Sequence, residues 1–270
     1  MKFGEVSIAE ALGGILAHGQ KAGSKRLKKG HRLTERDIDL LRAAGLTAVT
    51  VARLEADDMA EDEAAGSLCE ALCGEHLRSS APFTGRCNLF AQQPGLFEVD
   101  TALVDALNRI DEALTLATLP AFSTVRARQL LATVKVIPFA APRQAVARAL
   151  DMVRSDGPVL RLRVFEARDV ALVQTRLPGT SEAMLDKTTR VLTERLGRLQ
   201  MRLIHEGRCE HVPAILEQQI QIALQQGAQL VLIAGASAIV DRRDVLPAAI
   251  ERAGGEVVHF GMPVDPGNLL

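Results

Sequence analysis

The chain has 270 residues, of which 47% are hydrophobic and 24% charged, and its formal net charge is −1 at pH 7. This composition is typical of a soluble globular protein, and the length allows one large domain or two to three small ones. The near-neutral charge argues against a general nucleic-acid binder, and no uncharged apolar run is long enough to span a membrane. The first residues lack a secretory signal and the four cysteines lack zinc-finger spacing, so we expect buried free thiols in a cytoplasmic protein.

Residues 1–55 have the pattern of a small α+β subdomain. Ser7-Ile-Ala-Glu10 matches a capping box and predicts a helix over residues 7–18. Thr34 is placed to cap a second helix that Gly45 ends, and alternating β-branched residues predict a strand over residues 46–52. A basic run between the helices is interpreted as a solvated surface loop rather than a nucleic-acid patch.

Residues 56–157 predict a second α+β subdomain. Acidic residues precede a helix over residues 63–73, where negative charge stabilises a helix start and needs no catalytic explanation. Helical spacing continues over residues 99–113, and a strand over residues 133–137 ends at Pro138. A helix over residues 145–153 then leads to a linker around Gly157.

Residues 158–270 alternate strands with helices of ten to sixteen residues. The predicted strands are residues 160–165, 170–174, 202–204, 229–234 and 257–258. The predicted helices are residues 184–199, 212–226 and 245–253. Such alternation is typical of parallel βαβ units. The fold class is therefore α/β: a C-terminal three-layer α/β domain with a mixed, mostly parallel sheet, preceded by the smaller α+β domains.

The segment after residue 229 is the most informative part of the chain. A short apolar run ends at Gly235, small residues follow, and Asp241 and Asp244 stand where a helix should begin. Ligands bind outside the carboxyl ends of strands in open α/β sheets, and small residues let the backbone approach them closely. The alternative is that one of these aspartates simply caps the helix.

Several motifs in order resemble one protein family. They are Val6-Ser-Ile-Ala-Glu-Ala-Leu-Gly13, the segment from Leu27 to Ile38, Thr84-Gly-Arg-Cys-Asn-Leu89 and Ala132-Thr-Val-Lys-Val-Ile-Pro-Phe139, together with the loops of the C-terminal half. The chain thereby resembles the molybdate insertases of molybdenum cofactor biosynthesis and their gephyrin counterpart. Within that family it is similar to a bacterial subgroup often joined to a cytidylyltransferase domain.

The resemblance implies a molybdopterin site at the loops of the C-terminal domain. The residues implied in binding are Thr180, Ser181, Gly235, Ala236, Ser237, Asp265, Pro266, Gly267 and Asn268. Thr84, Arg86 and Asn88 are expected either to extend over the pterin or to form an ordinary polar loop. Asp244, with Asp241 second, maps onto the catalytic aspartate of the family. Each of these is individually an ordinary turn residue, and only their grouping points to a ligand.

The sequence also departs from the family pattern. The family has a Gly-Asp-Glu turn after the strand at residues 170–174, whereas this chain has Thr175 and Arg176 there. The family continues through another strand and helix beyond the position of Leu270, so the domain is expected to be cut short. Relatives of this kind are homodimers. We therefore expect a symmetric dimer whose interface joins the first half of one chain to the second half of the other.

Two classes of function remain open. One is a transferase that inserts molybdate into molybdopterin, with Asp244 orienting the oxyanion or a metal such as Mg²⁺ and Asp241 assisting. The other is a non-catalytic carrier that presents molybdopterin to a cytidylyltransferase, either a partner or a fused domain. Molybdopterin binding is common to both. A third interpretation is a nucleotide-binding α/β protein unrelated to molybdenum. It is not supported, because the sequence has no phosphate-binding glycine motif.

Overall fold

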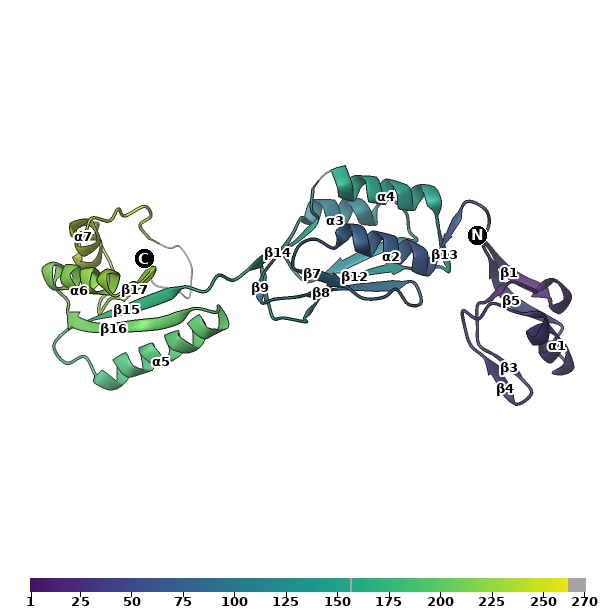
Figure 1. Cartoon of the computed structure of the whole chain (residues 1–270), viewed down its shortest axis with the longest axis horizontal. Helices are drawn as coiled ribbons and strands as arrows, with labels where there is room; N and C mark the ends of the chain where they lie inside the picture. The colour runs from purple at the N-terminus through teal and green to yellow at the C-terminus, as the bar shows by residue number, and fades with distance from the viewer. Residues whose placement is uncertain (156, 262–270) are drawn as a thin grey trace. The chain divides into compact units, whose positions relative to one another are not determined.

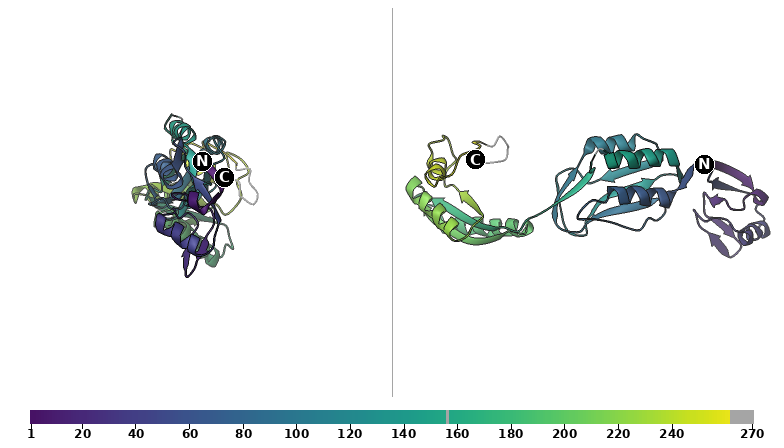
Figure 2. Two further views of the ribbon diagram at one scale, coloured as in Figure 1. Left: turned by 90° about the vertical axis from the view of Figure 1, so that its right-hand side faces the viewer. Right: turned by 45° about the horizontal axis from the view of Figure 1, so that its top comes forward.

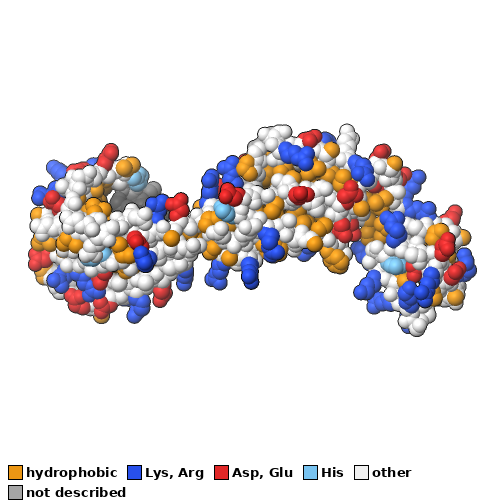
Figure 3. Space-filling model, viewed as in Figure 1, with side chains coloured by type: hydrophobic (Ala, Val, Ile, Leu, Met, Phe, Trp, Pro, Cys, Tyr) orange, Lys and Arg blue, Asp and Glu red, His pale blue; other side chains and the backbone are white. Residues whose placement is uncertain are grey.

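The computed structural model describes residues 1–155 and 157–261. These form two compact units, residues 1–164 and the part of the chain from Phe165 onward, shown in Figure 1. No helix among the described residues is long and apolar enough to cross a membrane. On the face shown in Figure 3, basic and acidic side chains are interspersed over both units.

The first 53 residues form a lobe with its own core. Strand β5 (Ala48–Arg53) lies between β1 (Lys2–Ser7) and β2 (Ile15–Leu16) in an antiparallel sheet. The hairpin of β3 (Gln20–Ala22) and β4 (Lys25–Leu27) and helix α1 (Glu35–Ala43) complete it. The core side chains include Leu16, Leu33, Leu41 and Val51.

The prediction of a helix over residues 7–18 is wrong. Only a short 3₁₀ helix forms, at Ile8–Glu10, and the chain then enters β2. Ser7 donates its hydroxyl proton to the Glu10 carboxylate, 2.7 Å away, instead of capping backbone N–H groups. The cause lies downstream: Gly13 has a φ of +74°, and a Cβ on Gly14 would lie 2.9 Å from Val51 Cβ. The left-handed conformation of Gly13 ends helical structure, and the close packing of Gly14 on Val51 leads the chain into the sheet.

The rest of the first unit is a sheet structure covered by helices. One antiparallel sheet has the order β10-β12-β8-β7, from Leu114–Thr118, Leu130–Val136, Arg86–Ala91 and Leu77–Ser79. Helices α2 (Glu61–Leu72), α3 (Thr101–Asn108) and α4 (Arg143–Ser155) lie on one face, as Figures 1 and 2 show. The buried core between them includes Leu68, Leu89 and Phe97. A two-stranded ladder pairs β6 (Asp58–Ala60) with β13 (Ala140–Pro142).

Two segments of this unit differ from the predictions made from the sequence. The helix expected over residues 99–113 is shorter, because Val99 ends strand β9 (Gly95–Val99) and residue 114 begins β10. The strand expected to open the C-terminal domain is present as β14 (Leu160–Val164), but it pairs antiparallel with β9. Strand β9 also pairs with β11 (Ser123–Val125), so β14 completes a sheet of the first unit.

The second unit has the expected α/β architecture. Strand β15 (Asp169–Arg176) lies between β16 (Arg202–Glu210) and β17 (Leu230–Ala234), and both pairings are parallel. Helix α5 (Glu182–Arg198) covers one face, and α6 (Pro213–Gln225) with α7 (Val245–Arg252) covers the other, as Figure 1 shows. The three layers confirm the predicted fold class. No strand forms at residues 257–258, where Val258 is 86% exposed and unpaired.

The alternating direction of the side chains along β15 explains how helices pack on both faces of the sheet. Val173 packs in a buried cluster with Leu216 of α6 and Leu246 of α7. Its neighbour Gln174 points the other way and donates hydrogen bonds to the Leu185 carbonyl and the Thr189 hydroxyl of α5. Because successive side chains of a strand point to opposite faces, one polar position sits under α5 while apolar positions support α6 and α7.

Candidate functional site

The carboxyl ends of the three parallel strands meet at one edge of the second unit. Strand β15 ends at Arg176, β16 at Glu210 and β17 at Ala234. The register pairs Thr175 with Cys209 and Gln174 with Ala234, so the following loops start side by side. This carboxyl edge is where open α/β sheets bind ligands.

Thr175 joins the loops at this edge. Its side chain is buried at 2% exposure, and its hydroxyl oxygen accepts a hydrogen bond from the Ala236 N–H at 2.8 Å. The same hydroxyl lies 2.9 Å from His211 Nδ1, in a hydrogen bond whose direction depends on the imidazole tautomer. One side chain of the central strand therefore holds the loop after β16 and the loop after β17 together.

The loop after β17 approaches its surroundings closely. A Cβ on Gly235 would lie 3.0 Å from Leu246 Cδ2 and 3.1 Å from the Ser237 carbonyl oxygen. Glycine therefore allows the chain to turn directly over the start of α7. The loop leaves Ser237 exposed, and Ala236 half-buried on Thr175.

Asp244 is the N-cap of α7. Its Oδ1 accepts from the Val245 N–H at 2.7 Å and its Oδ2 from the Val240 N–H at 3.1 Å. These bonds from Val245 and then Val240 lower the pKa of Asp244, and the nearby His211 adds to the effect. Both carboxylate oxygens are thus engaged by backbone, which is the capping role that the sequence left open.

Asp241 has a different local partner. Its Oδ1 accepts from the backbone N–H of Arg243 at 2.9 Å and from its Nε at 2.8 Å. The Arg243 side chain and then its backbone N–H lower the pKa of Asp241. Both side chains are exposed, so the pair shapes the loop and is screened by solvent.

The turn after β15 is closed on itself. The Thr180 hydroxyl accepts from the Leu177 N–H, and the Thr180 N–H donates to the Leu177 carbonyl, both at 3.0 Å. Ser181 occupies the N-cap position of α5 without a side-chain capping bond. The Ser181 carbonyl accepts from the Met184 N–H at 3.1 Å, but its side chain caps neither of the two N–H groups before it, at Glu182 and Ala183, and such groups attract anions.

A cavity of about 370 Å³ opens at the same edge. Arg176 and His211 supply its basic lining, Glu210 an acidic group, and Leu177, Pro178 and Val212 its apolar wall. The Arg176 guanidinium is 47% exposed and donates to Glu182 Oε1 at 3.1 Å. A cavity with an apolar wall and few polar groups has the character of a small-molecule site.

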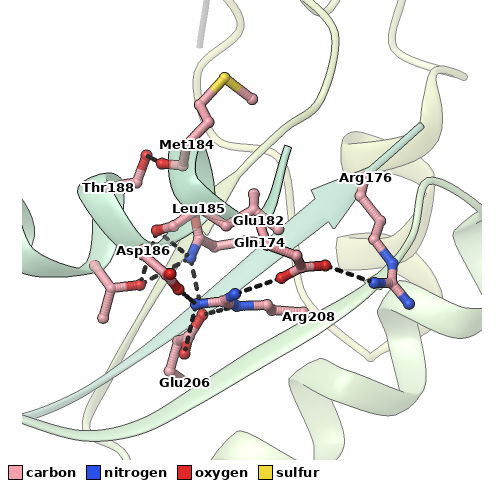
Figure 4. A network of polar contacts seen from close by, with 10 residues as sticks. Gln174, Arg176, Glu182, Met184, Leu185, Asp186, Thr188, Glu206 and Arg208 are labelled. Carbon is pink, nitrogen blue, oxygen red and sulfur yellow. Dashed lines mark hydrogen bonds and ion pairs between the residues drawn. The ribbon is translucent and has the colours of Figure 1, made fainter. Parts of the chain in front are cut away.

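A polar network lies beneath this edge on the α5 side (Figure 4). Arg208 donates to Glu206 at 2.6 Å, to Glu182 at 2.6 Å and to Asp186 at 2.7 Å. Burial opposes the ionisation of Glu206, but hydrogen bonds from Arg208 and Gln174 hold its pKa below the ordinary value. The three carboxylates in turn raise the pKa of Arg208.

Arg208 therefore sits among three carboxylates, where it supplies the cationic charge that they require. In the part of the chain that the structure describes, no group of three or more His, Cys, Asp or Glu residues is arranged to hold a metal ion. The sequence analysis did not single out this network. The local signal that could have pointed to it is Gln174, a polar residue that follows a run of buried apolar residues from Val170 to Val173.

The other predicted binding residues lie elsewhere. Thr84 and Gly85 form the tight turn that leads into β8, Arg86 begins that strand, and Asn88 accepts a 2.9 Å hydrogen bond from the Thr133 hydroxyl. All belong to the first unit, whereas the carboxyl edge belongs to the second. Asp265, Pro266, Gly267 and Asn268 lie outside the described residues.

Thr175 and His211 are the main residues that sequence reasoning missed. The sequence points to Thr175 only as standing where the family has an acid, and it does not single out His211 as a site residue. Their signal was positional, because each lies at the carboxyl end of a parallel strand.

Comparisons with known proteins give limited similarity. Residues 5–53 match the model of a family described as "Domain of unknown function (DUF8806)". No curated protein sequence matches the chain. Among solved structures it is similar to a molybdopterin biosynthesis MoeA protein from Pyrococcus horikosii, with 12% identity and a TM-score of 0.30. The match covers 98% of this chain and 66% of that chain, and it does not establish a shared fold or activity.

Proposed function

We propose that the second unit binds molybdopterin at the carboxyl edge of its sheet and serves molybdenum cofactor biosynthesis. The observation that carries the proposal is the junction at Thr175, which holds two ligand-type loops beside the cavity lined by Arg176 and His211. The sequence motifs supply the identity of the ligand. Molybdopterin has a phosphate and a flat polar pterin, which suit a guanidinium, free helix N–H groups and an apolar wall.

Binding without molybdate insertion is the form that the geometry favours. The Asp244 carboxylate is occupied by two backbone N–H groups, and Asp241 is paired with Arg243. Arg208 occupies the space among Glu182, Asp186 and Glu206. Each carboxylate of this set already has a hydrogen-bond or ion-pair partner, and the arginine partners reduce the negative charge that the set offers to Mg²⁺.

Molybdate insertion is the second candidate, and one observation favours it. Asp244 stands at the loop-to-helix junction beside His211, close enough for the imidazole to influence its pKa. Asp244→Asn keeps a capping oxygen, so the fold should survive the change. If the protein inserts molybdate through Asp244, the variant should retain pterin and lose molybdate incorporation. Equal incorporation by parent and variant would remove Asp244 from the chemistry.

The binding proposal is tested by identifying the retained ligand. The full chain is purified from cells that make molybdopterin, and released small molecules are identified by mass spectrometry. Arg176→Gln should weaken pterin retention roughly tenfold, because it removes one charge-assisted contact. Arg168→Gln is the matched control, since Arg168 precedes the opposite end of β15, is 46% exposed and pairs with Glu166. Absence of pterin from the parent, or equal loss in both variants, would refute the proposal.

A symmetric dimer and a cytidylyltransferase partner belong to the same proposal. The resemblance motivates both, and light scattering of the purified chain tests the first. A monomer at micromolar concentration would contradict it.

A further inference from the structure

A second cavity, of about 400 Å³, lies within the first unit. Its lining includes Lys29, Glu61, Thr84, Lys135, Ile137 and Phe139. The volume is within the range of small-molecule sites. Lys29 comes from the N-terminal lobe, and the other five come from the sheet structure that follows it.

Lys135 is held in a fixed position beside this cavity. Its Nζ donates to the Thr84 carbonyl at 2.9 Å and to the Val136 carbonyl at 2.6 Å. The Glu61 carboxylate is 3.9 Å away, an ion-pair distance that is too long for a hydrogen bond. An ammonium group has three N–H donors, so one remains for a ligand.

The turn beneath Lys135 is built around glycine. Gly85 has a φ of +70°, and a Cβ there would lie 2.6 Å from Glu61 Oε2 and 2.7 Å from Lys135 Nζ. The Gly85 N–H donates to Asp62 Oδ1 at 2.6 Å. The backbone therefore brings Glu61 and Lys135 together over the turn, and any side chain at Gly85 would displace one of them.

Lys29 adds a second positive charge. Its Nζ lies 5.6 Å from the centre of the Phe139 ring, and no carboxylate lies within ion-pair distance of it among the described residues. Among the described residues that line the cavity, Glu61 supplies one carboxylate against the two lysines. The cavity therefore carries a net positive charge beside the apolar surface of Ile137 and Phe139.

We propose that this cavity binds a small organic phosphate, with the phosphate between Lys29 and Lys135 and the carbon body against Ile137 and Phe139. A phosphate monoester carries a charge of about −1.5 to −2 at pH 7. It therefore matches the two ammonium groups better than a ligand with a single carboxylate would. This site is independent of the carboxyl edge of the second unit.

The proposal is tested by titrating phenyl phosphate into the full chain by calorimetry at fixed ionic strength. Inorganic phosphate and phenol, titrated separately, each represent one half of the probe. We expect phenyl phosphate to bind more tightly than either. Lys29→Met should weaken its binding at least tenfold, whereas Lys28→Met, which changes the exposed neighbouring lysine outside the cavity, should leave it unchanged.

Two further variants test the apolar contact with the ligand and the location of the binding site. Ile137→Ser should weaken phenyl phosphate while leaving inorganic phosphate unchanged, because Ile137 is 60% exposed and offers only apolar contact. Arg176→Gln should have no effect, since Arg176 belongs to the second unit. Absence of binding, or equal losses in Lys28→Met and Lys29→Met, would overturn the proposal. Loss in Arg176→Gln alone would place the phenyl phosphate at the carboxyl edge and would also overturn it.

Discussion

Asp37 is expected to control the stability of the N-terminal lobe. Its carboxylate is 2% exposed and accepts hydrogen bonds from Lys25 Nζ at 3.2 Å and His31 Nε2 at 2.7 Å. It also accepts from the Thr34 N–H at 3.1 Å and the Thr34 hydroxyl at 2.7 Å, which completes the capping box of α1. One buried charge thus ties the β3–β4 hairpin and the following loop to the helix start.

Asp37→Asn preserves the shape of the side chain and removes its charge. An amide group then faces donors from Lys25, His31 and Thr34, so at least one of these contacts becomes donor against donor. Hydrogen bonds to a charged group contribute about 1.5–3 kcal/mol each, and leaving a buried partner unsatisfied adds to the loss. We expect the lobe to lose about 2–4 kcal/mol of its free energy of unfolding.

Asp39→Asn is the matched control on the same helix. Asp39 is 75% exposed and pairs only with Arg42 at 3.3 Å, one turn along. Exposed pairs at this spacing contribute about 0.2–0.5 kcal/mol. The two substitutions are chemically identical, two residues apart, and differ in burial and partners.

Hydrogen exchange followed by mass spectrometry of the full chain gives the necessary local readout. A single melting curve would mix two compact units and would not report a two-state transition. A loss of about 2–4 kcal/mol corresponds to roughly 30-fold to 1,000-fold faster exchange in peptides from residues 20–45. Peptides from the second unit should not change. Equal exchange in Asp37→Asn and Asp39→Asn would refute the assignment of this stability to Asp37.

Two other predictions follow from the first unit. The pKa of Asp37 is well below its ordinary value, chiefly because of the His31 hydrogen bond, so its stabilisation is complete above about pH 4 and is lost as the pH falls further. The difference in lobe stability between the parent and Asp37→Asn, measured at each pH by hydrogen exchange in peptides from residues 20–45, should therefore shrink below about pH 4, and a constant difference would contradict this. Gly85→Ala should destabilise the turn before β8 and weaken phenyl phosphate binding, whereas Gly4→Ala, where nothing lies within 4 Å of a Cβ, should do neither.

The fold was predictable where local signals agreed with tertiary packing. Thr34 caps α1 as the sequence predicts, and the alternation of strands and helices after residue 165 gives a parallel sheet. The failures occur where distant contacts decide. The capping-box pattern at Ser7 was overridden by the close approach of Gly14 to Val51, and the assignment of β14 required its pairing with β9.

The location of the candidate site in the fold was predictable from the sequence, but the residues that form it were less so. Strand order and direction bring the loops after Arg176, Glu210 and Ala234 to one edge, which follows from the βαβ pattern. The contact of Thr175 with Ala236 spans 61 residues, and its contact with His211 spans 36. No local pattern encodes such partners, because both depend on the packed register of the sheet.

Asp244 illustrates why residue type alone does not establish catalysis. A carboxylate at a loop-to-helix junction has the same sequence pattern whether it caps the helix or acts on a ligand. Here each oxygen accepts one backbone N–H group, so an action on molybdate would have to use the remaining lone pairs of Asp244 or displace Val240 or Val245. Releasing Val245 would leave the first N–H group of α7 without this partner, and releasing Val240 would do the same in the loop before the helix. This arrangement favours the proposed binding edge in which Arg176 and His211, which line the cavity, meet the ligand rather than the aspartates, while Thr175 holds the two loops together.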